Sequence, residues 1–287
     1  MLLQARQDGL LRRPRFRPRR RIEPVTSPEP STIRSVALPS EHGGWSLTLE
    51  PVVLGLLVDP SWAGVFIGVA TLLAFLTRTP LKIALVDRHR RRTLDRTRIA
   101  GRVAAVEGAV LVAVATLAAV LAEDVSFLWP LLIAAPLVAI ELWYDIRSRS
   151  RRLIPELAGT VGVASVAAAI VLAAGSPDRL AAGLWCVAAA RAIAAVAFVR
   201  VQLRRSKAQP HNLWLSDGFQ LLAVAAVGIG WQLDAISTAG VIAVAALALV
   251  HAVLVRRPVP AVPTLGAQQV VLGLAVVLTA GLGAIAP

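Results

Sequence analysis

Residues 156–175 read ELAGTVGVASVAAAIVLAAG, and their only charged residue is Glu156 at the start. A helix of about this length crosses a hydrocarbon core roughly 30 Å thick. Eight further apolar stretches occur, at roughly 43–58, 61–77, 103–122, 126–143, 180–199, 213–231, 235–255 and 265–286. None alternates with a period of two, which excludes an outer-membrane barrel. We predict an all-α polytopic membrane bundle of about nine transmembrane helices over residues 39–287.

The composition supports a membrane protein and excludes a soluble enzyme. Hydrophobic residues make up 56% of the 287 residues and charged residues only 16%, against about a quarter charged in soluble domains. Cys186 is the only cysteine, so the chain cannot form an internal disulfide framework. Its surroundings of Ala and Val favour a buried filler over a nucleophile.

The basic residues predict the orientation. The net charge is +13, and 28 of the 30 Lys and Arg residues fall in the N-terminal tail and alternate connections, 78–102, 144–155, 200–212 and 256–264. Basic residues concentrate on the cytoplasmic side of membrane proteins. We therefore predict a plasma (inner) membrane protein with a cytoplasmic N-terminus and an external C-terminus. Because the basic residues do not form one face, nucleic acid is disfavoured as a partner, and anionic lipid headgroups are the expected partners.

Residues 1–38 form the other predicted unit, a disordered cytoplasmic tail rich in Arg and Pro. The run RRPRFRPRRRIEP lies within it, and such a composition cannot bury enough apolar surface to fold alone. It contains no apolar stretch long enough for a signal peptide.

Polar residues within membrane spans are costly and are functional candidates by default. Here they gather towards the predicted cytoplasmic side, where we expect a cavity that binds a substrate. His42 and Glu50 share a helix face, since they are eight residues apart with Ser46 midway. The candidate substrate-binding residues are His42, Glu50, Arg78, Lys82, Asp87, Glu107, Glu141, Asp145 and Arg191. No catalytic residue or metal ligand can be named among them.

Arg191 is the only cation inside a predicted span. It lies roughly 13 Å from the inner end of its helix, and Glu50 lies roughly 12 Å deep, at 1.5 Å per residue. Because an unpaired charge at this depth costs about 3 kcal/mol or more, we predict that the two residues pair. Such a pair either fixes helix packing alone or forms the ionic floor of a cavity.

The connection 78–102 reads RTPLKIALVDRHRRRTLDRTRIAGR and holds Arg78, Lys82 and Asp87. Arg side chains match the oxygens of phosphate groups, so this connection could clamp a phosphate or diphosphate. It could equally serve only as an orientation determinant held by anionic lipid. The sequence leaves both readings open.

The segment LPSEHGGW, residues 38–45, resembles the start of the membrane domain in the YwiC-like family of bacterial membrane proteins, a Pro-x-x-His-Gly-x-Trp element. Residues 78–82 (RTPLK), 156–159 (ELAG) and 200–205 (RVQLRR) also resemble that family. The resemblance covers most of residues 38–287. It implies a multi-pass membrane protein without an established activity.

The layout is also similar to that of UbiA-type intramembrane prenyltransferases. That similarity implies a prenyl diphosphate substrate and Mg²⁺, held by two Asp-rich motifs after the second and sixth helices. Here the first connection offers only Asp87 and Asp95, and residues 200–212 contain no acid.

We therefore predict a YwiC-like membrane protein with a cytoplasm-facing polar cavity, suited to transport or to binding a lipid or small anion. The alternatives are a divergent UbiA-type enzyme and a membrane anchor that binds acidic partners through its Arg-rich connections. No cofactor is evident, and Mg²⁺ is expected only for the UbiA-type alternative. Whether the protein is an enzyme, and its oligomeric state, are not predicted.

Overall fold

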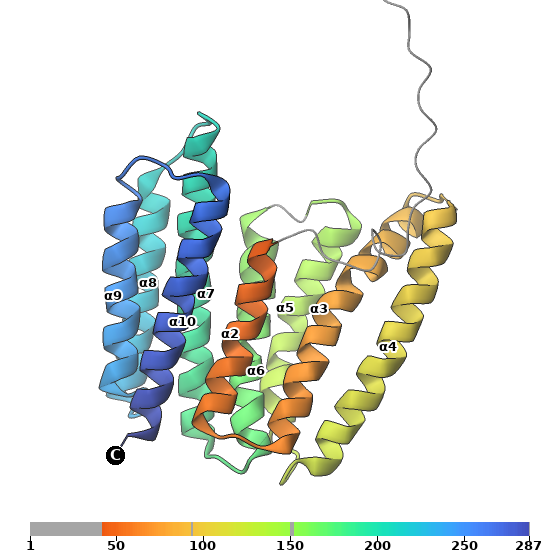
Figure 1. The fold of residues 1–287 in the computed structure, drawn as a ribbon, viewed down its shortest axis with the longest axis horizontal. Helices are drawn as coiled ribbons and strands as arrows, with labels where there is room; N and C mark the ends of the chain where they lie inside the picture. Colours follow the sequence, from red (N-terminus) through yellow and green to blue (C-terminus); the bar gives the residue numbers. More distant parts are fainter. Residues whose placement is uncertain (1–41, 93, 150–151, 287) are drawn as a thin grey trace, which may run out of the picture. The chain divides into compact units, whose positions relative to one another are not determined.

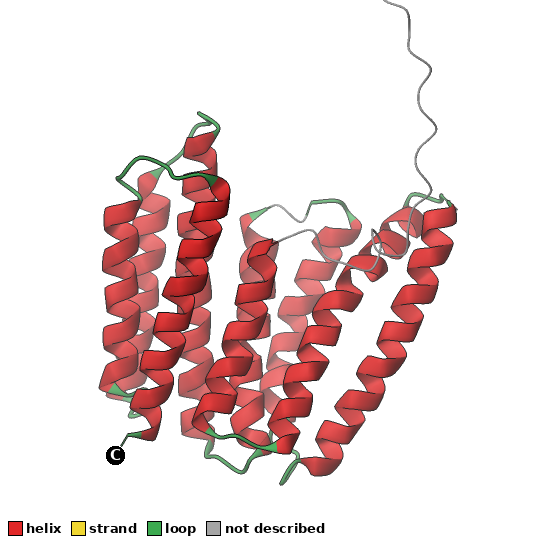
Figure 2. Cartoon of the chain, in the orientation of Figure 1, coloured by secondary structure: helices red, strands yellow, loops and turns green. Residues whose placement is uncertain are grey.

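The computed structural model describes residues 42–92, 94–149 and 152–286. Within these ranges it contains helices and no strands (Figures 1 and 2). The helices are α2 (His42–Val58), α3 (Trp62–His89), α4 (Asp95–Leu121), α5 (Leu128–Ile146), α6 (Leu153–Ala173), α7 (Asp178–Ser206), α8 (Leu213–Gln232), α9 (Thr238–Leu254) and α10 (Val262–Ile285). The predicted all-α class is confirmed, while the predicted tail, 1–38, lies outside the described residues.

Seven of these helices are long and apolar enough to cross a membrane. The other two, α2 and α9, have 17 residues each and are also apolar. Each meets the lower limit for a spanning helix, about 17 residues. The structure is a polytopic helical bundle, as predicted.

Short connections join successive helices, which run in alternating directions (Figure 1). Helix α6 is the most enclosed, since every residue from Ala164 to Ala173 is buried. It packs against α2, α3, α5 and α7. Six of its fourteen buried residues are Ala and two are Gly. Small residues let helices approach closely in lipid, where burial of apolar surface does not drive association. Most of α4 remains exposed, and among the described helices its main contact is α3.

The prediction that 78–102 is a connection between helices is wrong for most of that range. Helix α3 continues to His89 and α4 begins at Asp95. An apolar stretch marks where the hydrocarbon ends, but a helix satisfies its own backbone hydrogen bonds and can continue into water. The segment beyond Arg78 is rich in Leu, Ala, Lys and Arg, which favour helix. Arg78, Lys82 and Asp87 therefore lie on a rigid helix.

Candidate functional site

Glu50 and Arg191 form a buried ion pair between α2 and α7, as predicted. The Nη2 of Arg191 lies 3.0 Å from the Oε1 of Glu50. Only 5% of Glu50 and 2% of Arg191 is exposed. Both charges are shielded from solvent, so each depends on the other and on nearby polar groups.

Two further hydrogen bonds hold the pair in place. The Ser46 hydroxyl, one turn before Glu50 on α2, donates to the Glu50 Oε1 at 2.8 Å. The same Arg191 Nη2 donates to the backbone carbonyl of Gln269 on α10 at 2.7 Å. Helix α10 comes this close because residue 273 is a glycine. A Cβ at that position would overlap the Glu50 carboxylate and lie against the Arg191 guanidinium.

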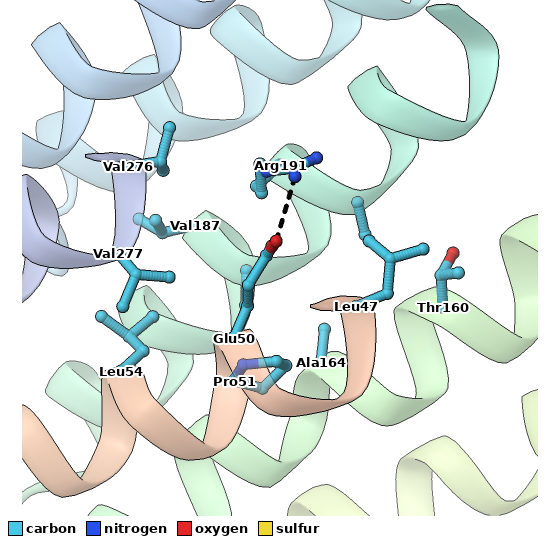
Figure 3. Close-up of a pocket in the computed structure, with 12 residues that line it drawn as sticks. Leu47, Glu50, Pro51, Leu54, Thr160, Ala164, Val187, Arg191, Val276 and Val277 are labelled. Carbon is cyan, nitrogen blue, oxygen red and sulfur yellow. Dashed lines mark hydrogen bonds and ion pairs between the residues drawn. The ribbon is translucent and has the colours of Figure 1, made fainter. Parts of the chain in front are cut away.

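A small cavity borders the pair (Figure 3). It provides about 10 Å³ for the centre of a water-sized molecule, enough for about one water. Apolar side chains supply most of the wall, among them Leu47, Val187 and Val276. Two nitrogens of Arg191, Nε and Nη1, are buried and have no hydrogen-bond partner among the described residues. The cavity therefore combines apolar walls with a cation that has unused donors.

A second cluster joins α3 to α5. Arg78 contacts Glu141 at 2.7 Å and Asp145 at 3.0 Å, and Lys82 Nζ lies 3.0 Å from the other Asp145 oxygen. Asp145 is fully buried, while Arg78 and Lys82 are about one-third exposed. Gly159 of α6 packs directly on the Glu141 carboxylate. The two positive charges on α3 thus balance the two negative charges on α5.

The two clusters lie on different sides of α6. Thr160 and Ala164 of this helix line the Glu50–Arg191 cavity, whereas Gly159 packs on Glu141.

Two candidate residues belong to neither cluster. Asp87 accepts from the Arg96 guanidinium at 3.0 and 3.2 Å and from the Thr97 hydroxyl at 2.7 Å.

Glu107 is the other residue outside both clusters. It lies on α4 with its Oε2 buried and without a hydrogen-bond partner among the described residues. His42 begins α2, and its side chain is outside the described part of the chain. The structure thus brings together the predicted residues in two groups and does not gather them around one cavity. That these residues bind a substrate stays a prediction.

Comparison with known proteins identifies the first part of the chain. The family model described as YwiC-like protein matches residues 38–172. Over these residues the chain is similar to the YwiC-like family. The predicted resemblance is confirmed there, while the RVQLRR segment at 200–205 lies beyond the matched range. No curated protein and no solved structure matches the chain.

The YwiC-like region contains Glu50, whereas Arg191 lies outside it. The buried pair therefore joins the matched part of the chain to the remainder. The second cluster differs, because Arg78, Lys82, Glu141 and Asp145 all lie within the YwiC-like region.

A buried hydrogen-bond network of two glutamines and one histidine extends from the ion pair through α10, α9, α8 and α7. None of these three residues was among the predicted site residues. Nε2 of Gln269 lies 3.2 Å from Nε2 of His251, and Nδ1 of His251 lies 3.3 Å from the Gln220 Oε1. An amide N–H can only donate, so Nε2 of a neutral His251 accepts and Nδ1–H donates. Gln220 in turn donates to the Ala194 carbonyl at 3.0 Å.

The sequence contains a signal for this hydrogen-bond network. Gln220 and Gln269 are amides within long apolar stretches, and polar groups in spans need partners. Their partners, however, come from helices distant in sequence. The ring of Phe198 stacks on His251 with centroids 4.3 Å apart, which fixes the imidazole in place.

The carboxylates do not fit a Mg²⁺ site in the described part of the chain. There, no three His, Cys, Asp or Glu side chains come close enough to share a metal ion. Asp87 is bound by Arg96, and Asp145 by Arg78 and Lys82. These cations already neutralise the two carboxylates, which leaves less negative charge to offset that of a metal ion. The UbiA-type alternative is therefore not favoured.

Proposed function

We propose that this membrane protein binds a small anion at Arg191 as one step in moving it across the membrane. The observation that carries the proposal is the arginine itself. Its guanidinium is 2% exposed, and two of its nitrogens are buried without a partner beside a cavity. Arginine cannot lose its proton to escape burial, so an anion entering the cavity would satisfy donors that the protein leaves unused.

The dimensions of the cavity limit the ligand. About 10 Å³ of free space admits a water-sized inorganic anion and excludes organic anions. Glu50 then controls affinity, because its charge neutralises Arg191 when the site is empty. The cavity faces the cytoplasm in this proposal.

Removing the Glu50 charge should strengthen anion binding, and removing both charges should abolish it. Purified protein is titrated with fluoride and chloride by calorimetry, with gluconate as the oversized anion. We expect Glu50→Gln to bind the small anions about tenfold tighter, or about 1.4 kcal/mol, since the Glu50 charge no longer neutralises the Arg191 cation. The double variant Glu50→Gln with Arg191→Gln should not respond, and gluconate should have no effect.

Arg179→Gln is the matched control, because Arg179 lies in the first turn of α7 and its side chain is 66% exposed. Unchanged anion binding in the double variant would overturn the site. Equal binding of gluconate would contradict the size limit. Release of the bound anion from proteoliposomes tests the transport step separately, and binding without release would reject transport while leaving the binding site.

We also propose the orientation predicted from charge: a plasma (inner) membrane protein with a cytoplasmic N-terminus and an external C-terminus. The ends of α3, α5, α7 and α9 carry the basic residues, and this end would contact anionic headgroups of the inner leaflet.

Cysteine labelling tests the orientation. With Cys186 replaced by Ser, a cysteine at Ser206 should react with a membrane-impermeant maleimide only after cells are permeabilised. A cysteine at Val125, which is 75% exposed in the α4–α5 connection, should react in intact cells. The reverse pattern would invert the proposed topology.

A further inference from the structure

A basic pocket lies at the ends of α3 and α5, away from the Glu50–Arg191 cavity. It is an open hollow of about 460 Å³, lined by His89, Arg90, Ile146, Arg147 and Arg149. Four of these five side chains are basic and none is acidic. The pocket is built similarly from both helices, since each is followed by a residue with a left-handed backbone, Arg91 at φ 52° and Ser148 at φ 55°.

The nearest acids on these two helices are already occupied. Asp87, two residues before His89, is bound by Arg96 and Thr97. Asp145, one residue before Ile146, is bound by Arg78 and Lys82. Because these two acids already pair with other cations, they do not neutralise the positive charge of the pocket.

Two contacts hold the arginines in position. The guanidinium of Arg90 donates to the Ser148 hydroxyl at 2.8 Å, which ties the α3 end to the α5 end. The guanidinium carbon of Arg147 lies 3.4 Å from the centroid of the Trp143 ring. Basic residues at helix ends can simply complement the helix dipole. Among the described residues, however, none of the four basic side chains of the pocket donates to a carbonyl at a helix end.

We propose that this pocket binds the headgroup of a membrane lipid that carries two phosphates. Arginine forks match phosphate oxygens, and the pocket supplies three arginines and a histidine within a volume larger than a single phosphate requires. The pocket opens at the ends of two apolar helices, and the exposed Trp143 beside it is typical of a residue at the membrane interface. Ile146 supplies an apolar wall for the first carbons of the acyl chains of the lipid.

This inference concerns a different site from the proposed anion pathway. It rests on the proposed position of this end at the headgroups of the membrane. The labelling experiment tests that position, whereas lipid binding is a separate measurement, so the two can fail independently.

The test compares two variants that each lose two positive charges from the same end of the bundle. Arg90→Gln with Arg149→Gln removes two pocket arginines and keeps the stacked Arg147. Arg88→Gln with Arg98→Gln removes two exposed arginines that do not line the pocket. Binding is measured in nanodiscs of phosphatidylcholine that contain cardiolipin, or phosphatidylglycerol at twice the molar fraction to match the charge.

We expect wild-type protein to prefer cardiolipin over charge-matched phosphatidylglycerol. The pocket variant should bind cardiolipin about thirtyfold more weakly, which corresponds to roughly 1 kcal/mol for each arginine. The matched variant should retain the preference. Equal losses in both variants would show only general attraction to a charged surface and would overturn the proposal.

Inorganic pyrophosphate distinguishes a lipid from a soluble ligand of the same chemistry. We expect it to compete with cardiolipin only weakly, because it lacks the apolar part that Ile146 and the membrane would hold. Pyrophosphate binding as tight as that of cardiolipin would assign the pocket to a soluble diphosphate and contradict the lipid proposal. Circular dichroism and size-exclusion profiles show that each variant is folded before its binding is compared.

Discussion

Arg191→Ala is expected to destabilise the protein by about 3–5 kcal/mol, the usual cost of breaking a buried ion pair. The substitution leaves the Glu50 carboxylate buried with the Ser46 hydroxyl as its remaining hydrogen-bond donor. It also removes the donor to the Gln269 carbonyl on α10. The midpoint of thermal unfolding in detergent measures the loss.

A double-mutant cycle isolates the pair itself. Glu50→Gln and Arg191→Gln should each destabilise the protein, because each leaves one charge buried without its counter-ion. The double variant should recover much of the loss, since two neutral amides can hydrogen-bond to each other. If the two single losses simply add, the ion pair does not hold α2 to α7. Arg179→Gln, at an exposed pair 3.8 Å from Asp234, should change stability little.

Gly273→Ala should cost about 2–3 kcal/mol, as expected when a group is forced into a packed interior. The added Cβ would overlap the Glu50 carboxylate, which cannot turn aside without losing Ser46 or Arg191. Helix α10 must then move away from α2 and α7. Chemical or thermal unfolding of the purified variant measures the effect.

Gly266 provides the matched control on the same helix. A Cβ there meets no other heavy atom within 4 Å, so Gly266→Ala should be neutral or stabilise α10 by up to about 1 kcal/mol. Similar changes in both variants would show that helix propensity dominates, and that α10 does not need close contact with the ion pair.

The membrane spans could be predicted from sequence because lipid imposes a simple requirement. Each crossing needs a long apolar stretch, so the helix positions follow from composition to within a few residues over most of the chain. The ends of α3 and α7 and the start of α4 could not be predicted in this way. All three helices extend into charged segments, where hydropathy changes but the backbone hydrogen bonds need not.

The sequence also predicted the Glu50–Arg191 pair, since depth along a helix is a property of sequence and a mid-span cation needs an anion. It did not separate this pair from Arg78, Glu141 and Asp145. Residues at similar depth can lie on different sides of a helix, and only the packing of α6 among its neighbours decides which ones meet.

The sequence by itself determined the helices, their apolar lengths and the end of the bundle that carries positive charge, because each depends on residues close together along the chain. Tertiary structure alone decided that Gly273 meets the ion pair and that His251 joins Gln220 to Gln269. It also decided that Arg90 and Arg149 share a pocket. These contacts depend on which helix faces come together. Many faces carry small residues of similar size and polarity, so the packing of the whole bundle decides which faces meet.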